Sequence, residues 1–337
     1  MNKKLLRWII LVVFLVGVFT IVSIFSLCVG SAFIPFKKII HIILEGRGTT
    51  DYSIIFDIRL PRILLGFAVG GALSIAGVIF QGIFRNPLVE PYTLGISGGA
   101  ALGVCLNLVL ELYKKEILSL PLSGFIGAIL VIFILYSLCI KHGILKIQGL
   151  LLTGVMISFI SSSLIMLIMA VSHIENLTGI IFWIMGSLEE PNWFLIKLSI
   201  LVSVSGLIIS YFFCLDLNAF SLGEESALHL GINIEKTKKL LFVLASFLTG
   251  ASVSVSGIIG FVGLVVPHFM RMFVGQDHRI LLISSFFCGA IFLIFCDTLS
   301  RIIISPLELP VGVITGILGG ALFIYALSKK QVVIGER

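Results

Sequence analysis

The sequence predicts an all-α polytopic membrane protein with about ten transmembrane helices. Hydrophobic residues make up 58% of the 337 residues and charged residues 12%, and the mean hydropathy is +1.19. A soluble domain is nearer a quarter charged, so a water-soluble globule with one anchor is excluded. Apolar segments recur from end to end, and we therefore treat 1–337 as a single transmembrane domain.

The expected spans follow one another with short connections. Each needs roughly 20 apolar residues to cross the hydrocarbon. Each is expected to be helical, because lipid cannot satisfy backbone polar groups. The seventh and eighth spans run almost together, so the sequence does not fix their boundary. The spans are expected near 8–29, 62–84, 92–112, 119–140, 148–171, 194–215, 239–257, 258–275, 279–300 and 309–328.

The distribution of lysine and arginine favours both termini in the cytoplasm. Lys3 and Lys4 precede the first span, and most other basic residues fall on the same side when ten spans are counted. Arg59, Arg62 and Arg301 go against this bias, since they lie on the expected outer side. Two interpretations remain open for them. They anchor the helices by snorkelling, or they form a positive rim for acidic groups of an extracytoplasmic partner.

The connection between the sixth and seventh spans, 216–237, is the most polar inner loop. Ser221 is a plausible N-cap with Glu224 three residues later, which forms a capping box. A short helix through His229 would follow and end at Gly231. A simple connection would need only a few residues, so we interpret the loop as a docking surface for a cytoplasmic partner and not as a merely solvated segment.

The sequence contains no recognisable ATP-binding motif. The phosphate-binding pattern G-x-x-x-x-G-K-[ST] does not occur in the 337 residues. Proton-coupled carriers place acids at mid-membrane depth, but Asp297 lies near a helix end, with Arg301 four residues later as a helix-surface ion partner. We therefore expect ATP and Mg²⁺ to bind a separate ATPase subunit. This chain is expected to carry no cofactor, metal or catalytic residue.

Small residues recur every four positions in two of the spans. Gly95, Gly99 and Gly103 share one helix face, and Gly312 and Gly316 share another. Such faces let two helix backbones approach closely. Packing within one subunit and a dimer interface or pathway both remain open. The six cysteines all lie in apolar segments without a CxxC pair, which predicts neither a disulfide nor a metal site.

A function of another class has a weak signal. Gly95-Ile96-Ser97-Gly98 matches the G-x-S-G of rhomboid-like intramembrane serine proteases, and His268 on another span could act as a base. A Ser–His pair is the minimum for acyl transfer. A four-residue pattern in a glycine-rich chain is far more often a packing feature, so we interpret Ser97 as a small residue that permits close helix packing.

Several separate blocks in one order resemble the FecCD-type permeases, with the resemblance strongest over 59–325. These blocks are RLPR, QGIFRNPLVEPYTLGISGGAALG, FWIMGSL, SLGEESALHLGI, GIIGFVGLVVPHFMR and ELPVGVITGILGGALFIYAL. Members of that family are membrane subunits of ATP-driven importers with the type II import fold of the cobalamin importer. The resemblance implies ten helices per subunit, a homodimer, two ATP-binding subunits and an extracytoplasmic substrate-binding protein.

The resemblance also implies roles for particular residues. Arg59, Arg62 and Arg301 would dock the binding protein. The fifth and tenth spans would line the pathway at the dimer axis. The coupling helix facing the ATPase would comprise Leu222, Gly223, Glu224, Glu225, Ser226, Ala227, Leu228, His229, Leu230 and Gly231. Gate and pathway positions would be Ile147, Gln148, Trp183, Gly186, Ser187, Gly312 and Gly316.

The resemblance implies a multi-pass protein of a bacterial or archaeal cytoplasmic membrane that imports an iron chelate, either a siderophore or haem. A cobalamin, corrinoid or oxyanion importer of the same family is the alternative. One departure bears on this choice, because Ile147 and Gln148 stand where the cobalamin importer carries small hydroxyl residues at its inner gate. Iron chelates come first by analogy alone.

Overall fold

The computed structural model describes residues 3–45, 48–116, 118–141 and 144–335. Within these residues seven helical stretches are long and apolar enough to cross a membrane, and three shorter apolar helices accompany them. The prediction of an all-α fold with about ten spans is therefore confirmed. The long spans contain α1 (Lys3–Cys28), α4 (Leu60–Phe84), α6 (Ser119–Cys139), α7 (Ile147–Val171), α9 (Trp193–Phe212), α12 (Ile234–Ser256) and α14 (His278–Ser300). The shorter helices are α5 (Ile96–Val109), α13 (Val262–Val274) and α15 (Val311–Gly335).

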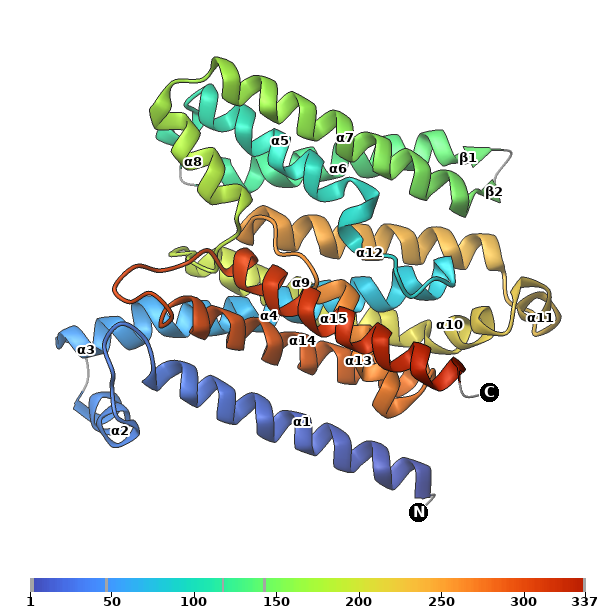
Figure 1. Ribbon diagram of the computed structural model, residues 1–337, viewed down its shortest axis with the longest axis horizontal. Helices are drawn as coiled ribbons and strands as arrows, with labels where there is room; N and C mark the ends of the chain where they lie inside the picture. The colour runs from blue at the N-terminus through green and yellow to red at the C-terminus, as the bar shows by residue number, and fades with distance from the viewer. Residues whose placement is uncertain (1–2, 46–47, 117, 142–143, 336–337) are drawn as a thin grey trace.

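Short elements lie at the two ends of the helix bundle (Figure 1). At one end are α2 (Phe36–Glu45), α3 (Thr50–Ser53) and α8 (Ile174–Ile184). At the other are α10 (Cys214–Ser221), α11 (Glu224–His229) and the antiparallel strands β1 (Ile140–Lys141) and β2 (Ile144–Leu145). Both chain ends lie at this second end. We call it the inner end, and the end with α2 the outer end.

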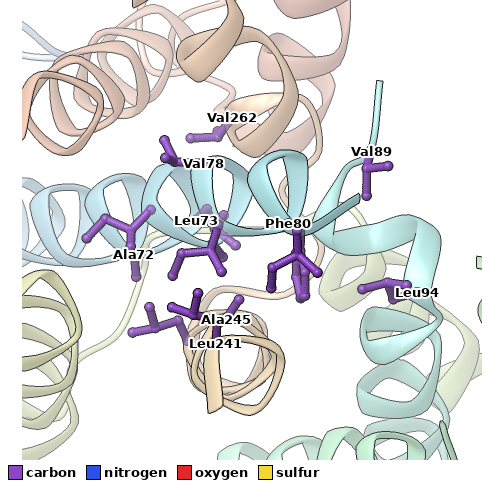
Figure 2. Close-up of a cluster of buried hydrophobic side chains, with 14 of the residues drawn as sticks. Ala72, Leu73, Val78, Phe80, Val89, Leu94, Leu241, Ala245 and Val262 are labelled. Carbon is purple, nitrogen blue, oxygen red and sulfur yellow. The ribbon is translucent and has the colours of Figure 1, made fainter. Parts of the chain in front are cut away.

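The core is built around α4. Within Thr50–Phe84, which contains α4, 89% of the 18-residue apolar segment is buried inside the protein. The corresponding share for α1 is 11%. This contrast places α4 at the centre and α1 at the periphery. Figure 2 shows Leu73 and Phe80 of α4 directed toward Leu241 and Ala245 of α12. All four side chains are completely buried, so α4 is the fixed frame for the surrounding spans.

Glycines let α4 contact its neighbours at the backbone. A Cβ at Gly77 would lie 1.9 Å from the carbonyl oxygen of Gly263 on α13, and one at Gly70 would lie 2.4 Å from that of Gly289 on α14. No larger residue fits at these positions without moving a helix. Close approach of small residues is the usual means of packing helices in lipid, and it fixes α13 and α14 against the frame.

Two of the boundaries that differ from the expected spans have a clear local cause. The third span becomes helical at Ile96 and not at 92, because Pro91–Leu94 form a 3₁₀ turn (η2) and Gly95 has a φ of +76°. The expected junction between the seventh and eighth spans is a non-helical segment at 257–261. Glycine at 257, with a φ of +67°, ends the helix there. The six cysteines are free thiols.

Candidate functional site

The three outer arginines lie inside the protein. Arg59 ends a π-helical turn (η1, Ile54–Arg59), Arg62 stands in the first turn of α4, and Arg301 follows α14. Their exposed fractions are 3%, 5% and 2%. A charged group is costly to bury unless it is paired, so each guanidinium needs nearby acceptors. Neither lipid-facing snorkelling nor an exposed positive rim describes this arrangement.

Arg62 joins two outer segments to α4. Its Nη2 atom donates to Glu308 Oε2 at 2.6 Å, and the same atom is ion-paired with Glu189. Glu189 lies after α8 and Glu308 lies just ahead of α15. Within the described chain, Nε and Nη1 of Arg62 are buried without a hydrogen-bond acceptor. The Arg62 side chain therefore retains unused donors even though two carboxylates already contact it.

The other two arginines attach α1 to the core. Arg301 pairs with Asp297 at 3.1 Å from Nε to Oδ2, and its Nη2 donates to the Ser26 hydroxyl at 2.7 Å. The Asp297–Arg301 pair predicted from the sequence is confirmed, but it is buried and not at a helix surface. Arg59 donates to the carbonyl oxygens of Leu27, at 2.6 Å, and Ala32. Cations at these carbonyls stabilise the C-terminal end of α1.

At the inner end the expected short helix is present as α11, although the capping box is wrong. Gly223, with a φ of +113°, occupies the N-cap position. Ser221 belongs to the end of α10, and its hydroxyl donates to the Asn218 carbonyl oxygen at 2.6 Å. Glu224 is therefore the first residue of the helix and not the partner of a serine cap. Gly231 has a φ of +80° directly after the helix, as expected for a C-terminal stop.

A buried lysine holds α11 against α12. Lys238, 4% exposed, lies 2.8 Å from Glu224 of α11 and 3.9 Å from Glu235 of its own helix. Glu235 in turn accepts the Leu145 backbone N–H at 2.8 Å. The connection runs from α11 through α12 to β2, which immediately precedes α7. Movement of α11 is thereby linked to the start of α7.

Three exposed leucines lie on and beside α11, next to exposed Glu225, Ser226 and His229. Leu222, Leu228 and Leu230 are exposed by 69%, 60% and 64%, although this segment is the most polar inner connection of the chain. Ala227 is fully buried and fixes the opposite face. Clustered exposed leucines at an aqueous end of a protein indicate a contact surface for a partner.

A second polar cluster joins α10, the helix before α11, to the spans α1 and α14. Asn218 of α10 donates to Asp277 at 3.2 Å and accepts the His278 backbone N–H at 2.8 Å. Asp277 also pairs with Arg279 at 2.7 Å and with Lys4 of α1 at 3.1 Å. These cations and the Asn218 amide hold the pKa of Asp277 well below its ordinary value, with Arg279 as the largest cause. The inner ends of α1, α10 and α14 are thus fixed together.

Three segments meet at the outer end of the helices, near the ends of α8, α12 and α15 (Figure 1). A Cβ at Gly186 would lie 2.6 Å from the Ile258 carbonyl oxygen, and one at Gly312 would lie 2.3 Å from that of Met185. The Ser187 N–H also donates to the Ser256 carbonyl oxygen at 2.9 Å. Trp183 and Ser187 line an adjoining cavity of about 270 Å³. The predicted outer gate residues are therefore in one closely packed cluster.

The remaining predicted positions lie apart from that cluster. Ile147 and Gln148 begin α7 at the inner end, half-buried and exposed respectively. Gly316 lies on α15, and among the described residues no atom outside its own helix is within 4 Å of where its Cβ would be. The expected glycine stripe on α15 therefore has two environments: Gly312 is packed within the chain, whereas Gly316 faces open space.

The chain matches the FecCD transport family over residues 10–329. It belongs to that family. The hemin transport system permease HmuU of Yersinia pestis is 36% identical, covering 93% of this chain and 95% of that protein. The Fe(3+) dicitrate permease FecD of Escherichia coli is 36% identical over 95% and 99%. The cobalamin permease BtuC of Halobacterium salinarum is 37% identical over 85% and 76%.

A solved structure has the same fold. A metal-chelate type ABC transporter in an inward-facing conformation superposes with a TM-score of 0.84 at 30% identity, covering 94% of this chain and 98% of that one. Family and fold together establish an ABC transporter permease subunit that spans the membrane several times. The permease subunits of this FecCD family are not themselves enzymes, so the protease interpretation has no support from the relatives.

The residues of the protease pattern have packing roles in this FecCD protein. Ser97 is buried in the first turn of α5, and a Cβ at neighbouring Gly98 would lie 3.1 Å from Ser161 of α7. The His268 ring lies edge-on to Phe323 of α15, with the ring centroids 5.7 Å apart. Both residues thus contribute to helix contacts on different elements.

Sequence reasoning missed Glu189, Glu308, Lys238 and Glu235. All four are charged residues in a chain where only 12% of residues carry a charge. Because charges are scarce, the two outer carboxylates could have been recognised as partners of the outer arginines. An acidic side chain expected at the same end of the spans as a buried arginine is its natural partner. Lys238 offered no such signal, since Lys236 and Lys239 stand beside it and only the structure shows which lysine points inward.

Proposed function

We propose that this chain is the permease of an ATP-driven importer that moves an iron chelate, either a siderophore or haem, into the cytoplasm. Two copies would form the pathway and alternate access between its two sides. Both termini would lie in the cytoplasm, two ATP-binding subunits would attach at the inner end, and a binding protein would deliver cargo at the outer end. ATP and Mg²⁺ belong to the ATP-binding subunits in this assembly.

The observation that carries this proposal is the group of three exposed leucines on and beside α11. Leu228 lies on a helix that Lys238 and Glu224 fix in place, and Leu222 and Leu230 flank that helix. An exposed apolar face costs free energy in water unless a partner covers it. A rigid mounting transmits force, because displacement of α11 must also displace α12 and the β-strands before α7. These properties suit a surface driven by an ATPase.

The docking of a binding protein is supported by the unused donors of Arg62. Its Nε and Nη1 atoms are buried without an acceptor among the described residues, so a partner carboxylate would reach them when Glu189, 62% exposed at its side chain, yields its place. Arg59 and Arg301 instead contribute the positive field beneath this position. Carboxylates on a partner would gain a bidentate contact with Arg62, in exchange for the intramolecular pairs.

A homodimer is supported by the exposed face of α15. Gly316 faces open space, and Ile317 and Ile324, which share one side of the helix, are exposed by 64% and 70%. A second α15 could approach closely at the glycine. The fifth and tenth spans, α7 and α15, would then border the pathway, with Ile147 and Gln148 at its inner mouth and the cluster of Trp183, Gly186, Ser187 and Gly312 at its outer mouth.

The cargo assignment is supported by relatives named for hemin and ferric dicitrate. One named for cobalamin import supports the alternative, a corrinoid importer, and an oxyanion is the third candidate. The test is uptake by proteoliposomes holding the chain with an ATP-binding subunit and a binding protein. A ferric siderophore, haem and cobalamin are compared side by side, with and without ATP. Uptake of cobalamin alone would overturn the iron-chelate assignment.

A further inference from the structure

The backbone between α12 and α13 leaves the helical conformation inside the protein. The segment 257–261 contains Ile259, which is fully buried, and Phe261, a residue other than glycine with a φ of +69°. Backbone N–H groups released from a helix in such a place need acceptors from elsewhere. The source of those acceptors decides what holds the break in position.

Both acceptors come from one short segment far away in the sequence. Glu90 Oε1 accepts the Phe261 N–H at 2.5 Å, and the Tyr92 hydroxyl oxygen accepts the Ile259 N–H at 3.1 Å. Glu90 and Tyr92 flank Pro91, which begins the 3₁₀ turn η2 between α4 and α5. Two side chains on one turn thus accept two of the N–H groups of the break.

The same hydrogen bond places Glu90 at the N-terminal end of α13. Phe261 is the N-cap residue of α13, and its own side chain makes no capping hydrogen bond. The N-terminus of a helix carries a partial positive charge and favours a negative group. Glu90 supplies that group from another part of the chain, in the way a capping carboxylate normally does from within its own helix.

The same turn contacts the two helices on either side. A Cβ at Gly263 of α13 would lie 2.7 Å from Pro91 Cδ, and one at Gly154 of α7 would lie 2.7 Å from the Leu94 Cα. The capped residue Phe261 continues the contact, since a Cβ at Gly319 of α15 would lie 2.5 Å from the Phe261 Cβ. The turn 90–94 therefore lies between α7 on one side and α13 with α15 on the other.

We propose that Glu90 and Tyr92 are positioning residues for transport. They hold the break at 257–261 so that Phe261 stays seated on Gly319 of α15 while α7 rests on the same turn. This inference rests on the proposed function, because α7 and α15 are the helices assigned there to the pathway. It predicts that loss of either acceptor releases Phe261 and disturbs the pathway, whereas α10 and α11 at the inner end keep their positions.

The first test does not depend on transport. Amide hydrogen exchange, followed by mass spectrometry, is measured on the ATPase-bound complex for peptides covering 257–263. Tyr92→Phe and Glu90→Ala should each raise the exchange rate of these peptides by about tenfold. This is the factor expected when one buried hydrogen bond is removed. Glu90→Gln keeps the volume and one oxygen acceptor, and it should show a smaller rise. Unchanged exchange in Tyr92→Phe and Glu90→Ala would overturn the inference.

The second test joins the inference to transport. Uptake and ATPase association are compared for wild type, Glu90→Ala, Glu90→Gln and the outer-surface control Glu111→Gln. We expect Glu90→Ala to lose uptake, Glu90→Gln to recover part of it, and all variants to retain the ATPase. Normal uptake by Glu90→Ala would contradict the inference. A wild type that binds the ATPase but moves no cargo would instead contradict the proposed function, with the exchange result still standing.

Discussion

Arg62 at the start of α4 and Glu308 ahead of α15 form an ion pair, with 2.6 Å between Nη2 and Oε2. The arginine belongs to the buried frame of the protein, whereas the glutamate belongs to the segment that leads into the last helix. Glu189 joins the same guanidinium from the segment after α8. The outer ends of two peripheral segments are therefore fixed to the frame by one charged group.

We predict that removing both carboxylates destabilises the protein more than removing either. In Glu189→Gln/Glu308→Gln the buried Arg62 guanidinium loses both contacting carboxylates and keeps only the nearby Asp297 charge. The cost should be at most about 3–5 kcal/mol, the value for breaking a fully buried pair. Each single variant leaves one partner in place. Thermal unfolding of the purified protein measures the difference, with Glu190→Gln as the matched control. A double variant as stable as the control would show that Arg62 needs neither carboxylate.

The two neighbouring acids of α11 should behave differently. Glu224 contacts buried Lys238, so Glu224→Lys places two cations together and should loosen α11 from α12. Glu225→Lys should leave the protein stable and act only through the partner. Thermal unfolding of the isolated chain and ATPase binding separate these effects. Equal loss of stability in the two variants would contradict this division.

Substitutions at two glycines of α15 should also have different effects. Gly312→Val forces a side chain against two carbonyl oxygens, of Met185 and Ile258, so the isolated chain should lose stability. At Gly316 the described residues of the same subunit leave the space around an added Cβ open, so Gly316→Val should instead weaken dimer formation. Unfolding temperature and the oligomer mass in detergent are the two measurements. A stable dimer of Gly316→Val would place the dimer interface elsewhere.

The stability contribution of Asp277 should be constant near neutral pH. Its pKa is lowered in the folded protein by Arg279, Lys4 and Asn218, so the folded state favours the ionised form. The contribution is fully present above the ordinary value of 3.8 and is lost as the pH falls through the folded value. The stability difference between wild type and Asp277→Asn should thus be constant from about pH 5 to 8 and shrink in acid. A difference that grows below about pH 4 would contradict the assigned sign.

Ser97→Ala should retain near-normal uptake, because Ser97 is a buried residue of the α5 packing surface. A serine nucleophile would instead lose all activity on losing its hydroxyl. The measurement is uptake by Ser97→Ala beside wild type at equal protein density. Complete loss with a normally folded protein would revive the protease alternative.

The sequence predicted the spans well because membrane helices are set by a physical rule that is local in sequence. A run of apolar residues of sufficient length must be helical in lipid, and α4, α6 and α9 begin within about two residues of the expected positions. The break at 257–261 was less accessible, since it depends on acceptors from Glu90 and Tyr92, more than 160 residues away. Only the fold brings these segments together.

The candidate site was predictable by residue type and less so by environment. The outer arginines and the short inner helix were recognised, but their partners were not. Arg59 is satisfied by the carbonyl oxygens of Leu27 and Ala32, which carry no sequence signal because every residue has a carbonyl. The capping box at Ser221 failed because α10 extends through that residue and left the N-cap to Gly223.

The most direct test of the account is ATP-dependent uptake by a variant of the α11 face. Leu228→Asp is reconstituted with the ATP-binding subunit and binding protein beside wild type and Leu112→Asp, an exposed leucine at the outer end. ATPase association and uptake of a ferric siderophore and of haem are measured together. We predict that Leu228→Asp loses both, whereas Leu112→Asp keeps the ATPase. Normal ATPase association and uptake by Leu228→Asp would contradict the claim that an ATPase drives this chain through α11.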